Sequence, residues 1–332
     1  MENTMKLKKL STAVLICLTV GAFTANATTL RLGHNTNPEG PTGKYFEMFA
    51  QAVKEKSDGK MRVRIFPNSQ LGTQREMLEQ VTSGLLDITK VDSSMLENIE
   101  PKYKALNFPY VFDNTIKMHE VLSGELGQEL LKSTENRGFI GLSYIMMTPR
   151  GYYSPKPING PEDLKGMKLR VQESNTMIRL VESIGAIPTP TPYGEVFSAL
   201  QQGMVDGVEG AGPSLYTARH GEIAKYFFED NHVQMANVIA ISNRSWNRLS
   251  EEQKTIINEA AIEAMNFSYT IGWEMEMELQ QKAVDQMGVT IVQPTDEQRT
   301  KLIQSIQPMY QALKNNEPEV FEFLNRIKLA QQ

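Results

Sequence analysis

The sequence predicts an α/β protein with two lobes, and three observations support this fold class. A strand, a helix and a cleanly alternating strand follow one another at 30–34, 44–56 and 61–66, which is the order of a parallel α/β unit. A pattern of helix, Gly, two apolar residues and Asp at 75–87 recurs at 194–206. The chain has 332 residues, and that length exceeds what one hydrophobic core commonly fills.

The chain begins with a segment that is typical of a secretory signal peptide. Three lysines precede an apolar run at 10–23, and Ala25-Asn26-Ala27 matches a cleavage site. We therefore predict a signal peptide over 1–27 and no membrane insertion after its cleavage; the alternative is a retained membrane anchor. Cys17 is the only cysteine and lies in this segment, so the mature chain is expected to have no disulfide, no cysteine-bound metal and no cysteine nucleophile.

Cleavage leaves an acidic chain. Of the 34 basic and 39 acidic side chains, three lysines and one glutamate lie in 1–27, which leaves 31 and 38 and a net charge of −7. No run of basic residues remains, so we expect no nucleic acid as a partner.

The remaining elements of the first lobe follow in order. We expect a helix at 74–83, a strand at 85–91 and a helix at 115–136 that ends before Gly138. The apolar segment 139–147 is predicted to be a strand that leads out of this lobe.

The second lobe is expected to be built from strands and helices in a similar order. A tight turn and a short strand are predicted at 163–171, and 233–242 is predicted to be a strand that returns to the first lobe. The longest helix is predicted at 250–286, where it opens with a capping box, crosses between the lobes and has Gly272 as a point for a bend. A last strand at 288–292 and a helix capped by 295–298 follow.

One arginine emerges from the predicted strand at 167–171. Side chains alternate along a strand, so Lys168 and Arg170 share one face and the apolar residues between them share the other. The planar guanidinium suits a carboxylate held through two parallel hydrogen bonds. This carboxylate is either a neighbouring side chain or a ligand.

The motifs of common catalytic and metal sites do not occur in the sequence. The four histidines lack the His-Glu-x-x-His and His-x-His spacings, and there is no Gly-x-Ser-x-Gly elbow. The glycine-rich segment 207–212 lacks the residues of a phosphate loop and is expected to be a loop where the backbone passes close to another group. We therefore expect no catalytic residue, no metal, no cofactor and no enzymatic activity.

Four motifs, in order along the chain, carry a resemblance to a known family. They are FPNSQLG at 66–72, DLKGMKLRV at 163–171, PYGEVFSALQ at 192–201 and VDGVE at 205–209. With them, essentially the whole mature chain resembles the substrate-binding proteins of tripartite ATP-independent periplasmic (TRAP) transporters. The resemblance implies a two-lobe periplasmic binding protein with a ligand cleft at the hinge and a long lobe-spanning helix.

This resemblance also implies how the chain is organised and what it meets. Lobe I would comprise 28–147 and 236–275, and lobe II would comprise 148–235 and 276–332. The protein would act in the periplasm, where it would bind a small organic acid and deliver it to the permease subunits of a TRAP transporter in the inner membrane.

The resemblance places a set of ligand-binding residues. Arg170 falls on the family's hallmark arginine and would grip the ligand carboxylate; the alternative is a structural ion pair. Arg150 falls on a second arginine, which either contacts the ligand or sits on a hinge loop. Tyr193 would cover the ligand or be a core aromatic. Residues at strand ends, at a helix start and in the fourth motif complete the set: Asn35, Gln74, Asp92, Glu173, Glu209 and Gly210.

The chain departs from the family at one position. Many members follow the motif Asp-Gly-x-Glu with an asparagine that contacts the ligand, whereas Glu209 is followed here by Gly210. That side-chain contact is absent, and a glycine would leave room for a bulkier or differently angled ligand.

The ligand class follows from the acidic members of this set. Asp92, Glu173 and Glu209 would repel a second carboxylate but accept hydrogen bonds from hydroxyls, so we expect a sugar acid, either a uronate or an aldonate. A C4-dicarboxylate, with Arg150 on its second carboxylate, is the alternative. A further alternative is a ligand-loaded partner of a sensor protein, because the same fold serves both roles.

Overall fold

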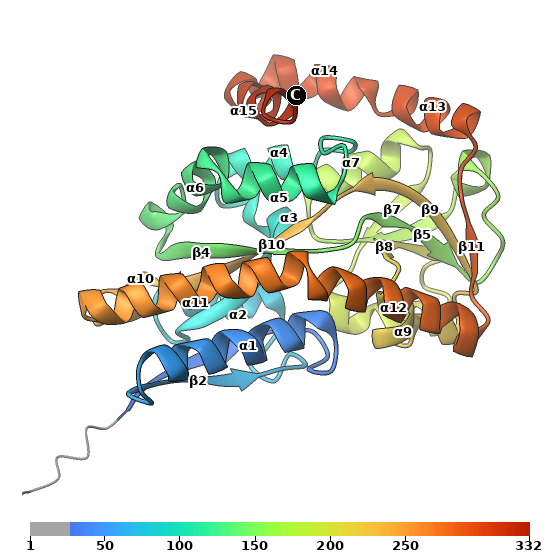
Figure 1. Cartoon of the computed structure of the whole chain (residues 1–332). Helices are drawn as coiled ribbons and strands as arrows, with labels where there is room; N and C mark the ends of the chain where they lie inside the picture. Colours follow the sequence, from blue (N-terminus) through green and yellow to red (C-terminus); the bar gives the residue numbers. More distant parts are fainter. Residues whose placement is uncertain (1–26) are drawn as a thin grey trace, which may run out of the picture.

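The chain forms two β-sheets, and extended segments at 147–149 and 234–235 connect them (Figure 1). The computed structural model describes residues 27–332, so the predicted signal peptide lies, except for Ala27, outside the described residues. The first sheet has the order β2-β1-β3-β10-β4 and the second the order β11-β9-β5-β8-β6-β7. This two-sheet α/β architecture confirms the predicted fold class.

The strands of the first sheet are β1 (Thr28–Gly33), β2 (Met61–Phe66), β3 (Ile88–Asp92), β4 (Phe139–Met146) and β10 (Ala236–Ser242). The elements between them are α1 (Pro41–Lys56), α2 (Gln74–Ser83), α3 (Ser93–Leu96), η1 (Pro101–Tyr103), α4 (Lys104–Asn107), α5 (Thr115–Ser123), α6 (Glu125–Lys132) and η2 (Glu135–Arg137).

The strands of the second sheet are β5 (Arg150–Ser154), β6 (Lys168–Val171), β7 (Ile187–Pro190), β8 (Gly207–Ala211), β9 (Tyr226–Val233) and β11 (Thr290–Val292). Its helical elements are η3 (Pro161–Leu164), α7 (Asn175–Ser183), η4 (Tyr193–Glu195), α8 (Val196–Gln201), α9 (Ser214–Thr217) and η5 (His220–Glu222). The remaining helices are α10 (Asn243–Trp246), α11 (Glu251–Tyr269), α12 (Ile271–Met287), α13 (Asp296–Ser305), α14 (Gln307–Asn316) and α15 (Pro318–Leu329).

The two sheets share an internal repeat. Each begins with three parallel strands, in the order β2-β1-β3 and β7-β6-β8, and the next strand, β10 or β5, is antiparallel to the third. Asp87 Oδ2 accepts the backbone N–H of Arg31 on β1 at 2.8 Å, and Asp206 Oδ2 accepts that of Lys168 on β6, also at 2.8 Å. The helix–Gly–Asp pattern at 75–87 and 194–206 therefore marks the same joint in both sheets.

Two short extended segments connect the sheets, and α10, α11 and α12 form a third connection, from β10 to β11. The chain leaves β4 and enters β5 through residues 147–149, and it returns from β9 to β10 through residues 234–235. The strand expected at 233–242 is thus split, with Val233 at the end of β9. Residues 207–212, expected to be a loop, form β8 for the most part, and the close backbone approach expected there is present: a Cβ on Gly207 would lie 2.8 Å from Tyr153 O.

The predicted long helix consists of two helices. It opens with the expected capping box at Ser250, but it breaks at Thr270 (φ −96°, ψ −92°) and not at Gly272. The hydroxyl of Thr270 donates to the carbonyl of Asn266 at 2.9 Å, and such local bonds compete with the helical ladder. Helix α11 packs on α1 and β4 of the first sheet, and α12 packs on α9 beyond β8, so the pair spans both sheets (Figure 1).

The helix predicted at 115–136 is also interrupted. Gly124 is extended (φ −87°, ψ −165°) and separates α5 from α6. A Cβ on Gly127 would lie 2.0 Å from Leu122 O, so the two helices pack at a distance that only glycine permits. A continuous helix could not form this contact.

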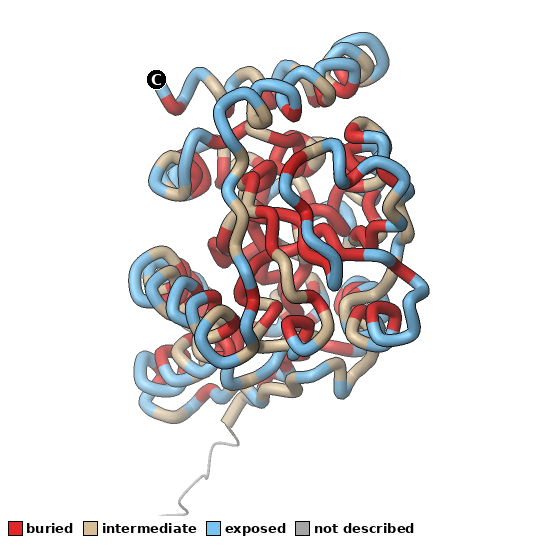
Figure 2. The backbone as a smooth tube through the Cα atoms, turned by 90° about the vertical axis from the view of Figure 1, so that its right-hand side faces the viewer, coloured by how far each residue is buried: buried red, intermediate tan, exposed pale blue. Residues whose placement is uncertain are grey.

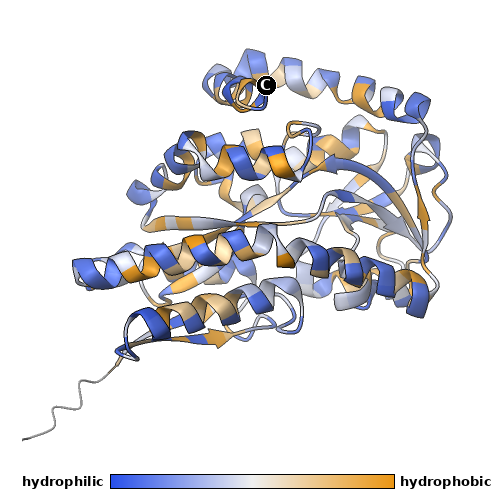
Figure 3. Ribbon diagram, in the orientation of Figure 1, coloured by the Kyte–Doolittle hydropathy of each residue, from blue (hydrophilic) through white to orange (hydrophobic). Residues whose placement is uncertain are grey.

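The core fills the spaces between sheets and helices. Most residues of the strands are buried, whereas the helices bury one side and expose the other, as the burial and hydropathy views show (Figures 2 and 3). At the C-terminus, α13 contacts η3, α14 contacts α7, and α15 contacts α4 and η1, so these helices touch elements of both sheets. The lobe bounds given above stay a prediction. No helix within residues 27–332 is long and apolar enough to cross a membrane.

Candidate ligand-binding site

Arg170 lies on β6 with its side chain directed into the interior. Gly166 (φ +74°) makes the predicted turn before the strand, Leu169 and Val171 enter the core, and Lys168 is exposed. Arg170 is only 4% exposed, and its Nε donates to Thr191 O at 3.0 Å.

The buried guanidinium of Arg170 forms no ion pair with the residues that the structure describes. No carboxylate of residues 27–332 lies within 4.0 Å of it, and burial followed by the nearby Arg150 lowers the pKa of Arg170. Burying a charge without a partner is costly, so this position favours an anion supplied from outside.

A cavity of about 130 Å³ adjoins Arg170, between loops of the two sheets. Two polar atoms at its wall, Asn35 Oδ1 and Gln74 Nε2, are buried without a hydrogen-bond partner in the described chain. Since buried polar groups are nearly always satisfied, one acceptor and one donor are available to a ligand. Six of the predicted residues line this cavity: Asn35, Gln74, Asp92, Arg170, Glu173 and Tyr193.

Hydrogen bonds link the two sheets beside this cavity. Asp92, at the end of β3, accepts from Lys90 Nζ and from Gln172 Nε2, both at 2.7 Å, and Ser94 Oγ donates to Gln172 Oε1 at 3.1 Å. Burial raises the pKa of Asp92, but Lys90 outweighs it and the net shift is downward, so the carboxylate is ionised. Asp92 is thus engaged by the protein at one side of the cavity.

Arg150 and Glu209 are paired with each other and are not among the residues that line this cavity. Both oxygens of the Glu209 carboxylate accept from Arg150, with Nε 2.5 Å from Oε1 and Nη2 2.9 Å from Oε2. His232 Nε2 lies 3.2 Å from Glu209 Oε1, and its Nδ1 lies 2.7 Å from Asp230 Oδ1. The four side chains form a buried network of alternating charge.

The pKa shifts in this network agree with its geometry. Burial raises the pKa of Glu209, but Arg150 and His232 lower it far below its usual range. Burial lowers the pKa of His232, but Asp230 and Glu209 raise it to about 9, so the imidazole is charged at neutral pH. The network thus compensates Arg150 internally, and the ligand contacts expected for Arg150 and Glu209 stay predictions.

Gly210 adjoins an aromatic ring. A Cβ there would lie 2.9 Å from Tyr153 Cε1, and the Tyr153 hydroxyl is 2.8 Å from His220 Nδ1. The room that we expected this glycine to leave for a ligand is filled by Tyr153, so that interpretation of Gly210 was wrong. Neither Gly210 nor Arg150 nor Glu209 lines a cavity beside Arg170.

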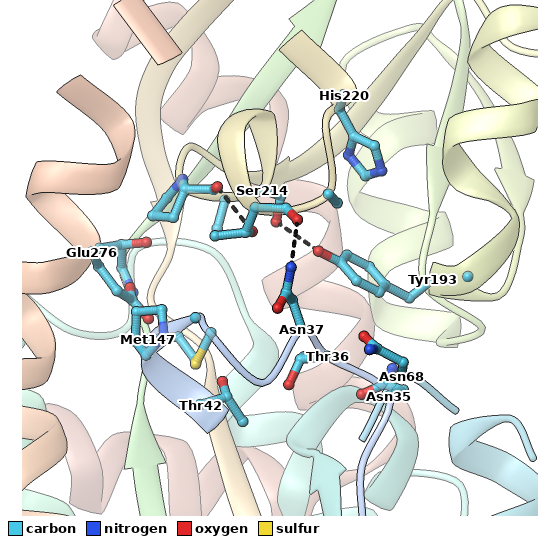
Figure 4. A pocket seen from close by; sticks show the side chains of 18 of the residues that line it. Asn35, Thr36, Asn37, Thr42, Asn68, Met147, Tyr193, Ser214, His220 and Glu276 are labelled. Carbon is cyan, nitrogen blue, oxygen red and sulfur yellow. Dashed lines mark hydrogen bonds between the residues drawn. The ribbon is translucent and has the colours of Figure 1, made fainter. Parts of the chain in front are cut away.

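A second cavity, of about 410 Å³, continues from the first. The residues that line both are Asn35, Ser69, Tyr193 and Gly194. Figure 4 shows Glu276 and Met147 on one side of it, Tyr193 and His220 on the other, and Asn37 between them, bonded through Nδ2 to Thr217 O at 3.5 Å.

Part of the second cavity is lined by a motif that was identified in the sequence. Asn68 and Ser69 lie in the FPNSQLG motif and both adopt positive φ, 53° and 56°, an unusual backbone that turns them toward the cavity lining. His220 and Glu276 were missed, because no local pattern marks either residue. No group of three His, Cys, Asp or Glu in the described part of the chain could hold a metal ion.

The chain matches one protein family and is similar to several bacterial proteins. The family model described as bacterial extracellular solute-binding protein, family 7, matches residues 32–316. The chain is 33% identical over 325 residues to the uncharacterised protein YiiZ of Salmonella typhimurium, with 97% of each chain covered. It is 25% identical to the C4-dicarboxylate-binding periplasmic protein DctP of Shewanella loihica, with 91% of this chain and 90% of DctP covered.

Solved structures match the whole fold. A TRAP periplasmic solute binding protein from Chromohalobacter salexigens, with bound D-glucuronate, has a TM-score of 0.86 and 29% identity and covers 91% of this chain and 99% of its own. The sugar acid binding protein DctPAm from Advenella mimigardefordensis, in complex with galactonate, has a TM-score of 0.88 and 28% identity and covers 92% and 99%.

Proposed function

Because this chain belongs to family 7 of the bacterial extracellular solute-binding proteins and is a TRAP solute-binding protein, we propose that it captures a sugar acid, a uronate or an aldonate. Family membership confirms the resemblance found in the sequence. The ligand class rests on the chemistry of the cavity and on the sugar acids bound in similar structures.

One observation carries the proposal: Arg170 is a buried cation whose counter-ion the described chain does not supply. Its Nε is taken by Thr191 O, which holds the guanidinium plane in place. The two terminal nitrogens then offer a fork to a carboxylate, and each charge-assisted bond contributes about 1.5–3 kcal/mol.

The rest of the cavity suits hydroxyl groups. Asn35 Oδ1 can accept from a hydroxyl and Gln74 Nε2 can donate to one, and both are otherwise unsatisfied within residues 27–332. Tyr193 contributes a flat apolar face at the junction of the two cavities. A sugar acid has both features, a carboxylate at one end and a row of hydroxyls.

A C4-dicarboxylate is the alternative, and the similarity to DctP of Shewanella loihica favours it. Such a ligand needs a second cation. Arg150, which we expected to serve this purpose, is paired with Glu209, and Arg75, at the first cavity, lies 3.5 Å from Glu173. The second cavity has no Lys or Arg among its described lining residues. These pairings favour the sugar acid.

Transport follows from the class of protein. We place the mature chain in the periplasm, where the loaded form would dock on the inner-membrane permease of a TRAP transporter. Closure of the two lobes would be stabilised by contacts that the ligand makes in the closed form and not in the open form. Service as a ligand-loaded partner of a sensor protein stays an alternative, and we expect no turnover of the bound acid.

Isothermal titration calorimetry of residues 28–332 tests the ligand class. We expect binding of D-glucuronate or D-galactonate and none of succinate or malate. Binding of the dicarboxylates alone would exclude the sugar acid. Protein refolded after denaturation should be used, because a co-purified ligand would mask binding.

A further inference from the structure

The cavity beside Arg170 has room for little more than the sugar that carries the carboxylate, and the larger second cavity beside it provides space for an extension. Ligand pockets commonly measure about 300–1,000 Å³. The first cavity, about 130 Å³, falls below this range, whereas its neighbour, about 410 Å³, lies within it. They meet at Asn35, Ser69 and Tyr193, so a ligand anchored on Arg170 can extend past these residues.

Glu276 is the chemically distinctive group of the second cavity. It projects from α12, is 4% exposed, and accepts the backbone N–H of Thr148 through Oε2 at 2.6 Å. No Lys, Arg or His of the described chain lies within 4.0 Å of its carboxyl group. Burial raises the pKa of Glu276 to about 7. The second oxygen, Oε1, has no hydrogen bond recorded within residues 27–332 and belongs to a cavity-lining side chain.

The opposite wall is neutral. His220 Nδ1 pairs with the Tyr153 hydroxyl, and burial followed by the nearby Arg170 lowers the pKa of His220 to about 3, so the ring is uncharged. Hydroxyl and amide side chains make up most of the remaining polar lining: Thr36, Asn37, Thr42, Asn68, Ser69 and Ser214.

We propose that the second cavity is a subsite for a neutral, hydroxylated extension of the ligand, and that Glu276 determines specificity there by accepting a hydrogen bond from a sugar hydroxyl. The natural ligand would then be an acidic disaccharide, with its carboxylate on Arg170 and its neutral sugar between Glu276 and His220. This inference rests on the proposed function and adds the second sugar to it.

The lining selects against other extensions. A second carboxylate would meet Glu276 with no cation among the described lining residues to compensate it, and like charges in a low-dielectric site repel strongly. A purely apolar tail would leave the amides and hydroxyls unsatisfied. A sugar ring satisfies them with its hydroxyls and can pack its C–H face on Phe197 and Tyr193, which both line the cavity.

Calorimetry with a matched pair of probes tests the subsite. Gluconate carries the carboxylate and the hydroxyl chain, and lactobionate is gluconate with a galactose attached. We expect the native protein to bind lactobionate at least about tenfold more tightly than gluconate. This difference in affinity is about what one additional well-formed hydrogen bond contributes.

Two variants assign this preference to the second cavity. Glu276→Gln keeps the shape of the side chain but removes the carboxylate, and Ala218→Phe places a ring at the cavity wall. Both are expected to remove the preference for lactobionate while gluconate affinity changes by less than about threefold. Far-UV circular dichroism and thermal unfolding confirm that each variant is folded.

The outcomes distinguish the second-sugar subsite from the sugar-acid function on which it rests. Binding of gluconate or glucuronate with equal or weaker binding of lactobionate overturns the second-sugar subsite and leaves the sugar-acid function intact. A lactobionate preference that persists in both variants overturns the role of Glu276 and of this cavity. Binding of none of the sugar acids overturns the proposed function itself.

Discussion

Arg150 Nε on β5 lies 2.5 Å from Glu209 Oε1 on β8, and β8 pairs with β6, which carries Arg170. The two buried arginines therefore have opposite situations. Glu209 compensates the charge of Arg150, whereas no carboxylate of residues 27–332 lies within 4.0 Å of Arg170. This contrast sets the expectations for mutations at each site.

Replacement of Arg170 tests the carboxylate clamp. Arg170→Ala should weaken sugar-acid binding by about 2–5 kcal/mol, because it removes one partner of a buried charged pair. Arg170→Lys should also lose much of the affinity, since a point charge cannot reproduce the fork. Titration calorimetry measures both. Lys168→Ala, which changes an exposed side chain of the same strand, is the control, and equal affinities in all four proteins would contradict the clamp.

Replacement of Glu209 should act on stability. Glu209→Gln leaves Arg150 and His232 as buried charges with incomplete compensation, and breaking a buried pair in this way costs about 3–5 kcal/mol. Urea denaturation measures the loss of unfolding free energy. A variant of native stability that has lost ligand affinity would instead support a direct ligand contact for Glu209, as the sequence suggested.

Because the imidazole of His232 is charged in the folded protein at neutral pH, the free energy of unfolding should fall as the pH becomes alkaline. The pKa of His232 is raised from 6.5 to about 9 in the folded protein, so its contribution is fully present below about pH 6.5 and is lost as the pH rises through 9. The shift corresponds to at most about 3 kcal/mol. Thermal unfolding between pH 6 and 10 should show this loss, and His232→Gln should show a flatter profile from a lower starting stability.

Substitution at Gly210 distinguishes packing from ligand access. Gly210→Ala would place a methyl group 2.9 Å from Tyr153 Cε1, so the ring must shift, and overpacking of this kind costs about 1–3 kcal/mol. Thermal unfolding measures the cost. The double variant Gly210→Ala/Tyr153→Phe retains the clash with the ring carbon, and it should be no more stable than the single variant. A stable Gly210→Ala protein would mean that Tyr153 can move at little cost.

Local patterns in the sequence predicted much of the fold. The bounds of β2 and α2, the capping boxes at Ser250 and Thr295, and the repeated joint at Asp87 and Asp206 all depend on residues close in sequence. Arg170 was identified because a lone arginine on an apolar strand is conspicuous. These features carry their information within a few residues of chain.

The remaining features depend on contacts between distant residues. Arg150 meets Glu209 59 positions away, and Glu276 meets Thr148 128 positions away. No local pattern reveals such pairs, because strand order and helix docking bring them together. The breaks at Gly124 and Thr270 were misjudged for a related reason: helical spacing continues through both positions, and packing against neighbours decides where the helix ends.

The internal repeat has a consequence for the order of events in binding. Since Asp87 and Asp206 mark equivalent joints, the position on β1 that corresponds to Arg170 on β6 is Gly33, where a Cβ would lie 2.7 Å from Met77 Sδ. The repeat that contains β6 thus has a cationic side chain at this position, whereas the repeat that contains β1 has a glycine without a charge. We expect the anion to dock first on the half that contains β6, with the half that contains β1 folding over it afterwards. Release would reverse this sequence, with the acid staying on β6 until last.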